Sequence, residues 1–71
     1  MKNIQLKNSV KSRRINCGNI TQSELAKKVG ITRQTLHLIE HQKYNPSIKV
    51  CLLIADALNT TIEKLFWMEE K

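Results

Sequence analysis

An arginine and a glutamine stand together in the middle of the chain, directly after a threonine, in the order Thr32-Arg33-Gln34. An arginine guanidinium can form two coplanar hydrogen bonds to guanine, and a glutamine carboxamide can form two to adenine. Leu38 follows Gln34 by about one helical turn, where its methyl groups could contact the methyl group of thymine. Alternatively, Leu38 is partly buried against the following helix. We therefore predict that Arg33, Gln34 and Leu38 read base pairs.

Two short amphipathic helices are expected to position these side chains. Thr21 is followed three residues later by Glu24, which is the capping-box pattern of a helix start, and Gly30 suits the left-handed residue that ends a helix. Thr32 can cap the second helix, which runs to Glu40. Apolar residues at helical spacing form the inward faces, namely Leu25, Ala26, Val29, Leu36 and Ile39. The spacing predicts a helix-turn-helix over residues 21–40, a motif whose second helix enters the major groove of DNA.

The remaining periodicity predicts an all-α fold, a compact bundle of five short helices in a single domain over residues 1–71. The other three helices are expected over residues 8–16, over 47–58 with Ser47 as its cap, and from Thr61 onward, with Thr61 as the cap of the fifth helix. The fourth should bury Ile48, Cys51 or Leu52, Ala55 and Leu58, and the fifth should bury Ile62, Leu65 and Phe66. Asn59 is expected as a left-handed stop between them.

The charge is strongly positive and unevenly distributed. The net charge is +6, and residues 1–20 carry five basic side chains and no acid, whereas residues 61–71 carry two basic and three acidic side chains. A basic amino-terminal third indicates a polyanionic partner approached from one side. The alternative is a basic, soluble surface without a specific partner.

Several function classes lack the residues that they need. No apolar run approaches the length of a membrane span and no export segment is evident, so we expect a cytoplasmic protein. Cys17 and Cys51 are expected to be free thiols, because zinc binding by them with His37 and His41 would lack paired spacing. No nucleophile-base pair or phosphate-binding glycine loop is present, so we predict no enzyme, cofactor, metal or small-molecule effector.

Taken together, these segments resemble the Cro and cI repressor type of helix-turn-helix, also called the xenobiotic-response-element family. The resemblance covers about residues 6–68. The segment VKSRRINCG is similar to the first helix of the phage 434 repressor, whereas ELAKKVGITRQTLHLIE, YNPSIKV, IADAL and IEKLFW resemble small bacterial and archaeal single-domain members. The resemblance implies a lambda-repressor-like fold that binds double-stranded DNA sequence-specifically.

Further contacts to the DNA backbone are expected on both sides of the reading helix. Gln22, at the amino end of its helix, could meet a phosphate oxygen, as the resemblance also implies, or could act only in capping. Thr32, Thr35 and His37 flank the reading face, although a surface histidine without a role is the alternative for His37. The resemblance implies backbone contacts from the loop residues Lys43, Asn45 and Ser47, although an exposed loop lysine without a role is the alternative.

The resemblance also implies a buried ion pair between Arg14 and Glu40, which we assign to folding rather than chemistry. Two departures from the family pattern stand out. His41-Gln42 replaces the usual Asn-Gly after the reading helix, so a left-handed residue there would cost about 1 kcal/mol without glycine. One extra residue stands among positions 17–19, which leaves the entry angle of the second helix open.

One small domain offers few contacts, so we expect a homodimer on a palindromic operator, with half-sites about 34 to 36 Å apart. Surplus apolar side chains could form its interface, namely Leu53, Phe66, Trp67 and Met68, although Phe66 and Trp67 could simply close the core. The predicted function is a transcriptional repressor or autoregulator. The alternatives are an antitoxin or restriction-modification controller with a protein partner, and an interaction domain that has lost DNA binding.

Overall fold

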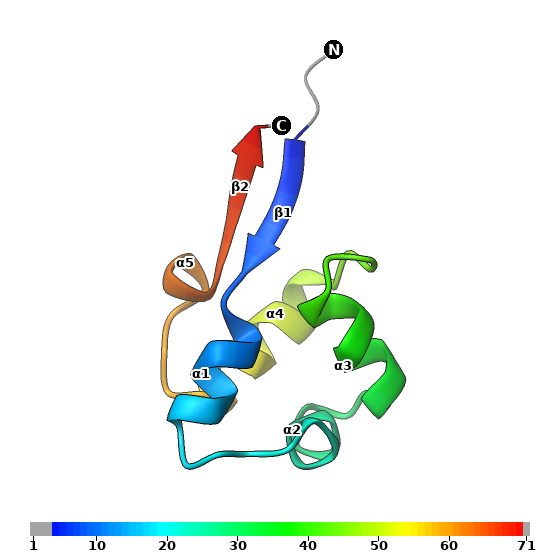
Figure 1. Ribbon diagram of the computed structural model, residues 1–71, viewed down its shortest axis with the longest axis vertical. Coiled ribbons are helices and arrows are strands. Elements are labelled where there is room, and N and C mark those ends of the chain that lie inside the picture. The colour runs from blue at the N-terminus through cyan, green and yellow to red at the C-terminus, as the bar shows by residue number, and fades with distance from the viewer. Residues whose placement is uncertain (1–3, 71) are drawn as a thin grey trace.

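The computed structural model describes residues 4–70 as a helical body from which a two-stranded ribbon extends (Figure 1). Five helices lie between the two strands along the chain. In chain order the elements are β1 (Ile4–Asn8), α1 (Val10–Asn16), α2 (Gln22–Val29), α3 (Arg33–Glu40), α4 (Ile48–Ala57), α5 (Ile62–Leu65) and β2 (Phe66–Glu70). The five predicted helices are therefore present, and the first begins at Val10 rather than near residue 8.

The prediction of an all-α fold was wrong at the two ends of the chain. β1 pairs with β2 in an antiparallel ribbon, from Ile4 opposite Glu70 to Asn8 opposite Phe66. Each strand has only five residues, and its partner lies about sixty positions away, so neither carries a local signal of its own. The fifth helix ends at Leu65, and Phe66 already has an extended backbone with φ −126° and ψ 141°.

The core lies between the five helices and the first residue of β2. Its buried members are Val10, Leu25, Ala26, Val29, Leu36, Ile39, Cys51, Ile54, Ala55, Leu58, Leu65 and Phe66. The inward face of α4 differs from the prediction at its first turn. Cys51 rather than Leu52 is buried, and Ile48, the first residue of the helix, is 69% exposed. Burial in α4 therefore starts one turn later than the apolar pattern indicated.

The caps predicted at Thr21, Thr32 and Ser47 are confirmed, whereas Thr61, the predicted cap of the fifth helix, makes no side-chain capping bond. The Thr21 hydroxyl accepts a hydrogen bond from the Glu24 amide at 3.1 Å, and the Glu24 carboxylate accepts one from the Thr21 amide at 2.9 Å. Gly30 has the expected left-handed backbone, with φ 78°. The hydroxyls of Thr32 and Ser47 accept bonds from the third amide of α3 and α4 respectively. These interactions fix where α2, α3 and α4 begin, and Gly30 fixes the turn between α2 and α3.

Three further positions have left-handed backbones without glycine. Gln42 has φ 60°, so the loop after α3 keeps the left-handed geometry that we expected to be costly without Asn-Gly. Asn59 has φ 55° and ends α4 as predicted. In the connection before α2, Gly18 and Asn19 are both left-handed, with φ 93° and 58°. The extra residue there is accommodated by a double turn in the backbone.

Candidate nucleic-acid interface

Helix α3 is buried on one side and open to solvent on the other. Leu36, Ile39 and Glu40 are buried, whereas Arg33, Gln34 and His37 are exposed. Thr35 and Leu38 are intermediate, so part of the Leu38 side chain stays accessible and both interpretations of this residue stay open. The polar side chains at the start of α3 therefore point away from the core, as an element that reads DNA requires.

A buried ion pair joins α1 to the end of α3. The Arg14 guanidinium donates two hydrogen bonds to the Glu40 carboxylate, from Nε to Oε2 at 2.8 Å and from Nη2 to Oε1 at 3.2 Å. Its Nη1 donates a third to the carbonyl oxygen of Ile20 at 2.8 Å. Both charged side chains are almost completely buried. The predicted pair is present, and its bidentate geometry is the strong form of such a contact.

Gln22 extends this pair to the outer surface. Its Nε2 donates to Glu40 Oε1 at 2.9 Å, and its Oε1 accepts a bond from Arg33 Nη1 at 3.2 Å. A chain of hydrogen bonds therefore runs from buried Arg14 through Glu40 and Gln22 to exposed Arg33. We predicted a phosphate contact for Gln22, whereas in the protein alone its carboxamide orients Arg33. This orientation lowers the entropy that Arg33 would lose on binding.

His37 on α3 and His41 directly after its end lie one turn apart, next to this chain of hydrogen bonds. Their ring centroids are 4.2 Å apart, and Nδ1 of His41 lies 2.9 Å from the His37 carbonyl oxygen. Because a carbonyl oxygen only accepts, Nδ1 of His41 carries the proton in this contact. Nδ1 of His37 lies 3.5 Å from Gln22 Nε2. His37 therefore borders the side chain that orients Arg33.

Neither thiol shares a site with these histidines. Cys17 donates a hydrogen bond through Sγ to the Leu58 carbonyl oxygen at 3.2 Å. Cys51 is buried in the core, and this burial raises the pKa of its thiol. Within residues 4–70, no group of three or more His, Cys, Asp or Glu side chains could hold a metal ion.

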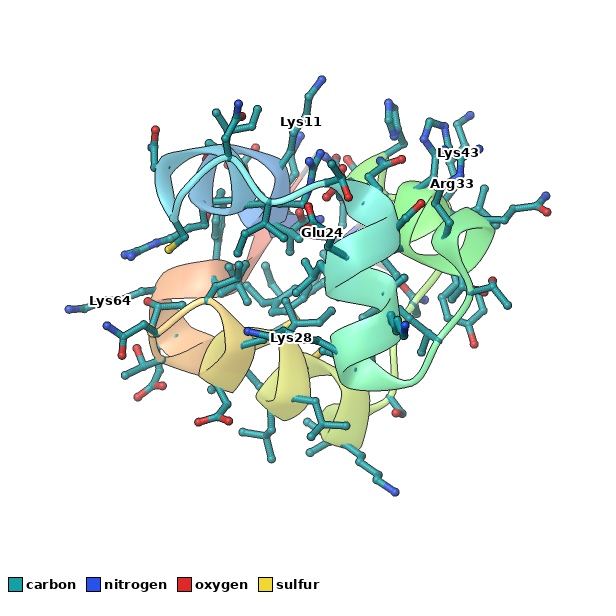
Figure 2. All side chains as sticks on the ribbon, turned by 90° about the horizontal axis from the view of Figure 1, so that it is seen from below. Lys11, Glu24, Lys28, Arg33, Lys43 and Lys64 are labelled. Carbon is teal, nitrogen blue, oxygen red and sulfur yellow. The ribbon has the colours of Figure 1, made fainter. Side chains whose placement is uncertain are left out.

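The side chains of Gln22, Arg33 and His37 border an open concavity of about 590 Å³. It is lined by residues from α1, α2, α3 and their flanking turns, namely Lys11, Arg14, Thr21, Gln22, Ser23, Arg33, His37 and His41. Lys11, Arg33 and Lys43 lie in the upper half of Figure 2, whereas Lys64 points to the opposite side from Arg33. Besides Arg14, the lining contains Lys11, Arg33 and two histidines but no acidic side chain. This concavity therefore suits an anionic backbone.

Lys11 was missed as a site residue by the sequence analysis. It is exposed on α1 and borders the same concavity as Arg33. A signal was available, because Lys11 precedes Arg14 by three positions and helical residues three apart share a face. Because Arg14 was predicted to pair with Glu40 at the end of the reading helix, Lys11 could have been predicted on the side of α1 that faces this helix.

The loop between α3 and α4 is tied to the end of the reading helix. The Lys43 amide donates to the Leu38 carbonyl oxygen at 2.8 Å, and the Gln42 amide donates to that of Ile39 at 3.1 Å. Lys43, Asn45 and Ser47 are exposed, although the Ser47 hydroxyl already accepts the capping bond of α4. The loop thus presents a lysine and an asparagine from a backbone of fixed geometry.

The four residues that we expected at a dimer interface fall into two groups. Phe66 is buried in the core, which supports the alternative that it closes the core. Leu53 on α4 is 38% exposed, and on β2 Trp67 and Met68 are 41% and 73% exposed. Leu53, Trp67 and Met68 are therefore available to a partner, and Phe66 is not.

Comparisons with known proteins agree with this geometry. A family model described as "Helix-turn-helix" matches residues 10–65. An uncharacterized HTH-type transcriptional regulator of Archaeoglobus fulgidus is 47% identical over 53 residues, which are 75% of this chain and 75% of the relative. The uncharacterized HTH-type transcriptional regulator YgzD of Bacillus subtilis is 41% identical over 66 residues, which are 93% of this chain and 98% of the relative.

Among solved structures, the SinR protein/SinI protein complex contains a chain that is 31% identical, with a TM-score of 0.70. The match covers 76% of this chain and 52% of that chain, so this protein spans about half of its length. In residues 4–70, no helix has the length and apolar character needed to cross a bilayer. The matched family and the named relatives are DNA-binding regulators rather than enzymes. The fold, the exposed face of α3 and these matches show that the chain belongs to the Cro/cI-type helix-turn-helix family of DNA-binding domains.

Proposed function

We propose that this protein is a sequence-specific transcriptional regulator whose residues 1–71 act as one domain on double-stranded DNA. The observation that carries the proposal is the oriented side chain of Arg33. Its guanidinium stands at the exposed start of α3 and is held by Gln22, which is itself held by the buried carboxylate of Glu40. A side chain fixed in this way before binding is suited to selecting one base pair over another.

Base reading and backbone binding are assigned to different residues. Arg33 and Gln34 contact base edges in the major groove, and the accessible part of Leu38 contacts a thymine methyl group. Lys11, Thr35, His37, Lys43 and Asn45 contact the sugar-phosphate strands from around the concavity. Thr32 and Ser47 contribute mainly by capping α3 and α4, which holds these helices at the DNA surface. Gln22 serves both groups, since a phosphate can approach the amides at the start of α2 while its side chain orients Arg33.

The regulator acts as a homodimer on a palindromic operator and represses transcription, including that of its own gene. A single helix-turn-helix of this size makes too few contacts for tight, selective binding, and a second copy doubles them. Leu53, Trp67 and Met68 are exposed apolar side chains available for the association.

A second function is favoured by one comparison. The similar SinR structure is a complex with the SinI protein, so a protein with this fold can have a protein partner. An antitoxin or a restriction-modification controller would use the same DNA-binding face and add such a partner. The exposed side chains of Ile48 and Leu52 on α4 would be available to it.

The test is selection of bound duplexes from a random library, followed by salt titration of the selected and random duplexes. We expect one enriched palindromic motif and a steep decrease of log affinity with log salt for both duplexes. Lys43→Ala should weaken both by a similar factor and flatten the salt dependence. Lys64→Ala, the matched control on another side of the molecule, should leave both unchanged. Equal affinity for every duplex would exclude sequence-specific regulation.

A further inference from the structure

The geometry points to β2 as the dimer contact: β2 of one copy pairs antiparallel with β2 of a second copy, centred on Met68. The resulting sheet has four strands in the order β1-β2-β2-β1, with the twofold axis between the two central strands. This inference rests on the homodimer proposed above and specifies its interface and register.

The ribbon has edges that a second copy can extend. Within residues 4–70 the sheet contains only β1 and β2, and the ribbon extends beyond the helical body (Figure 1). A two-stranded ribbon is only marginally stable, and an exposed strand edge is a template for pairing with another strand. β2 contains no proline, and its acidic residues are confined to its last two positions. Its amino-terminal part therefore has no built-in protection against pairing.

The apolar face of the ribbon is only half covered. Residues directly opposite each other point to the same face, so Leu6, Met68 and Phe66 share one face with Ile4. Near the body, Phe66 is buried and Leu6 packs against the core. Farther along the ribbon, Ile4 and Met68 are 56% and 73% exposed. The apolar row thus continues from the core along the ribbon, and no described residue covers its outer end.

Charge disfavours one alternative register for a second copy on β2, and the alignment of apolar side chains favours the register centred on Met68. Pairing centred on Met68 places Met68 opposite Met68 of the second copy, Trp67 opposite its Glu69, and Phe66 opposite its Glu70. A shift centred on Glu69 would instead place two carboxylates directly opposite each other, which is destabilising. The Met68 register also aligns Leu6, Met68 and the same two residues of the second copy in one apolar row across four strands.

The opposite face of the sheet is complementary in the same register. Lys7 lies opposite Trp67 within one copy, and Trp67 lies opposite Glu69 of the second copy. The indole ring of Trp67 therefore lies between a basic side chain of its own copy and a carboxylate of the second copy, and no like charges face each other on this side of the sheet. Self-pairing of β1 about Leu6 would instead place Gln5 opposite Lys7 and Ile4 opposite Asn8 of the second copy. An apolar side chain would then lie opposite a polar one.

A charge exchange at Met68 tests this interface without DNA. Met68→Lys and Met68→Glu each place like charges across the twofold axis, so each variant alone should dimerise at least about tenfold more weakly than the parent. An equimolar mixture of the two should form heterodimers at least as readily as the parent forms homodimers. Sedimentation equilibrium and native mass spectrometry measure both quantities, and circular dichroism confirms that the exposed substitution leaves the helices intact.

Two control variants locate the interface. Ile4→Lys changes an exposed apolar residue on the same face of the ribbon but on β1, and it should weaken the dimer less than Met68→Lys. Leu53→Lys changes the exposed apolar residue on α4 proposed above for the association, and it should leave the dimer unchanged because α4 lies outside the β2 contact. Heterodimer formation only in the mixture supports the inference. Variants that dimerise like the parent, a mixture that does not pair, or a dimer lost only with Leu53→Lys would overturn it.

These results are independent of the proposed DNA function. If the parent protein dimerises through Met68 but binds no duplex, the interface stands and the regulator proposal fails. If Met68→Lys still binds a single half-site while the parent is monomeric at all concentrations, alone and on the full operator, the interface fails and DNA binding stands.

Discussion

The helix-turn-helix over residues 21–40 and the ribbon of β1 and β2 are built in opposite ways. The features that begin and end the helices of the helix-turn-helix are local, namely the capping box of Thr21 and Glu24, the left-handed Gly30 and the cap at Thr32. The ribbon instead joins the two ends of the described chain, and its outer residues Ile4 and Met68 are exposed. Local sequence signals thus determine the surface that we propose meets DNA, and a non-local pairing forms the surface that we assign to a second copy.

The two regions should differ most in hydrogen exchange. In a dilute, monomeric sample we expect core amides of α3 and α4 to exchange only through global unfolding. Amides of the outer ribbon should exchange about a thousandfold faster or more, because fraying costs little free energy. Exchange followed by NMR measures both, and protection of β2 should increase with protein concentration as copies pair. Equal protection of both regions in the monomer would remove the contrast.

Among substitutions in and around the helix-turn-helix, loss of the buried ion pair should lower the free energy of unfolding most. Arg14→Ala leaves the Glu40 carboxylate buried without its guanidinium, so the free energy of unfolding should fall by about 3 to 5 kcal/mol. Urea denaturation measures the change. The double variant Arg14→Met with Glu40→Leu should recover most of it. A loss below about 1 kcal/mol for Arg14→Ala would mean that the pair does not hold α1 to α3.

Helix caps should have a smaller effect that follows the hydrogen bonds. Thr21→Ala removes the acceptor of the Glu24 amide and should lower the free energy of unfolding by about 1 kcal/mol. Thr61→Ala is a matched control, because Thr61 is also an exposed N-cap residue but makes no side-chain capping bond. Thermal denaturation should therefore show almost no change for Thr61→Ala. Similar losses for both variants would contradict a role for the capping bond.

Glu24 should give the smallest effect, visible as a pH dependence. The hydrogen bonds from the Thr21 backbone and side chain hold the pKa of Glu24 below its ordinary value of 4.5. Because the folded pKa is depressed, this stabilisation is present above pH 4.5 and is lost as the pH falls through the folded pKa. Glu24→Gln keeps the hydrogen-bonding pattern, so its deficit against the parent should shrink in acid. Denaturation midpoints measured between pH 7 and pH 3 give this deficit. A deficit that grows in acid would contradict a lowered pKa of Glu24 in the folded protein.

The sequence predicted most of the helix-turn-helix because its signals lie within one helical turn of the residues they fix. Thr21, Gly30, Thr32 and Ser47 all have the roles expected of them. The Arg14 and Glu40 pair was predicted only from the family resemblance, since 26 positions separate the two residues. The hydrogen bond that Arg33 donates to Gln22 was not predicted, because it depends on the angle between α2 and α3.

The ribbon could not be predicted for a related reason. Five-residue strands such as IQLKN and FWMEE carry little pattern, and their pairing follows from the helical body that brings the ends of the chain together. Phe66 shows the consequence. Its apolar character correctly indicated packing at the end of α5, but its burial in the core takes it out of the predicted dimer interface, whereas Met68 two residues later is exposed.

The central claim, that the exposed face of α3 reads base pairs, is tested most directly by one pair of variants on two duplexes. Arg33→Ala and Lys43→Ala are each titrated against the selected operator and a random duplex at one fixed salt concentration. We predict that Arg33→Ala reduces the ratio of operator to random affinity by about 5- to 150-fold, as expected for one lost base contact of about 1 to 3 kcal/mol. Lys43→Ala should lower both affinities and leave the ratio unchanged. If Arg33→Ala lowers both affinities equally, α3 does not read the sequence through Arg33 and the account is wrong.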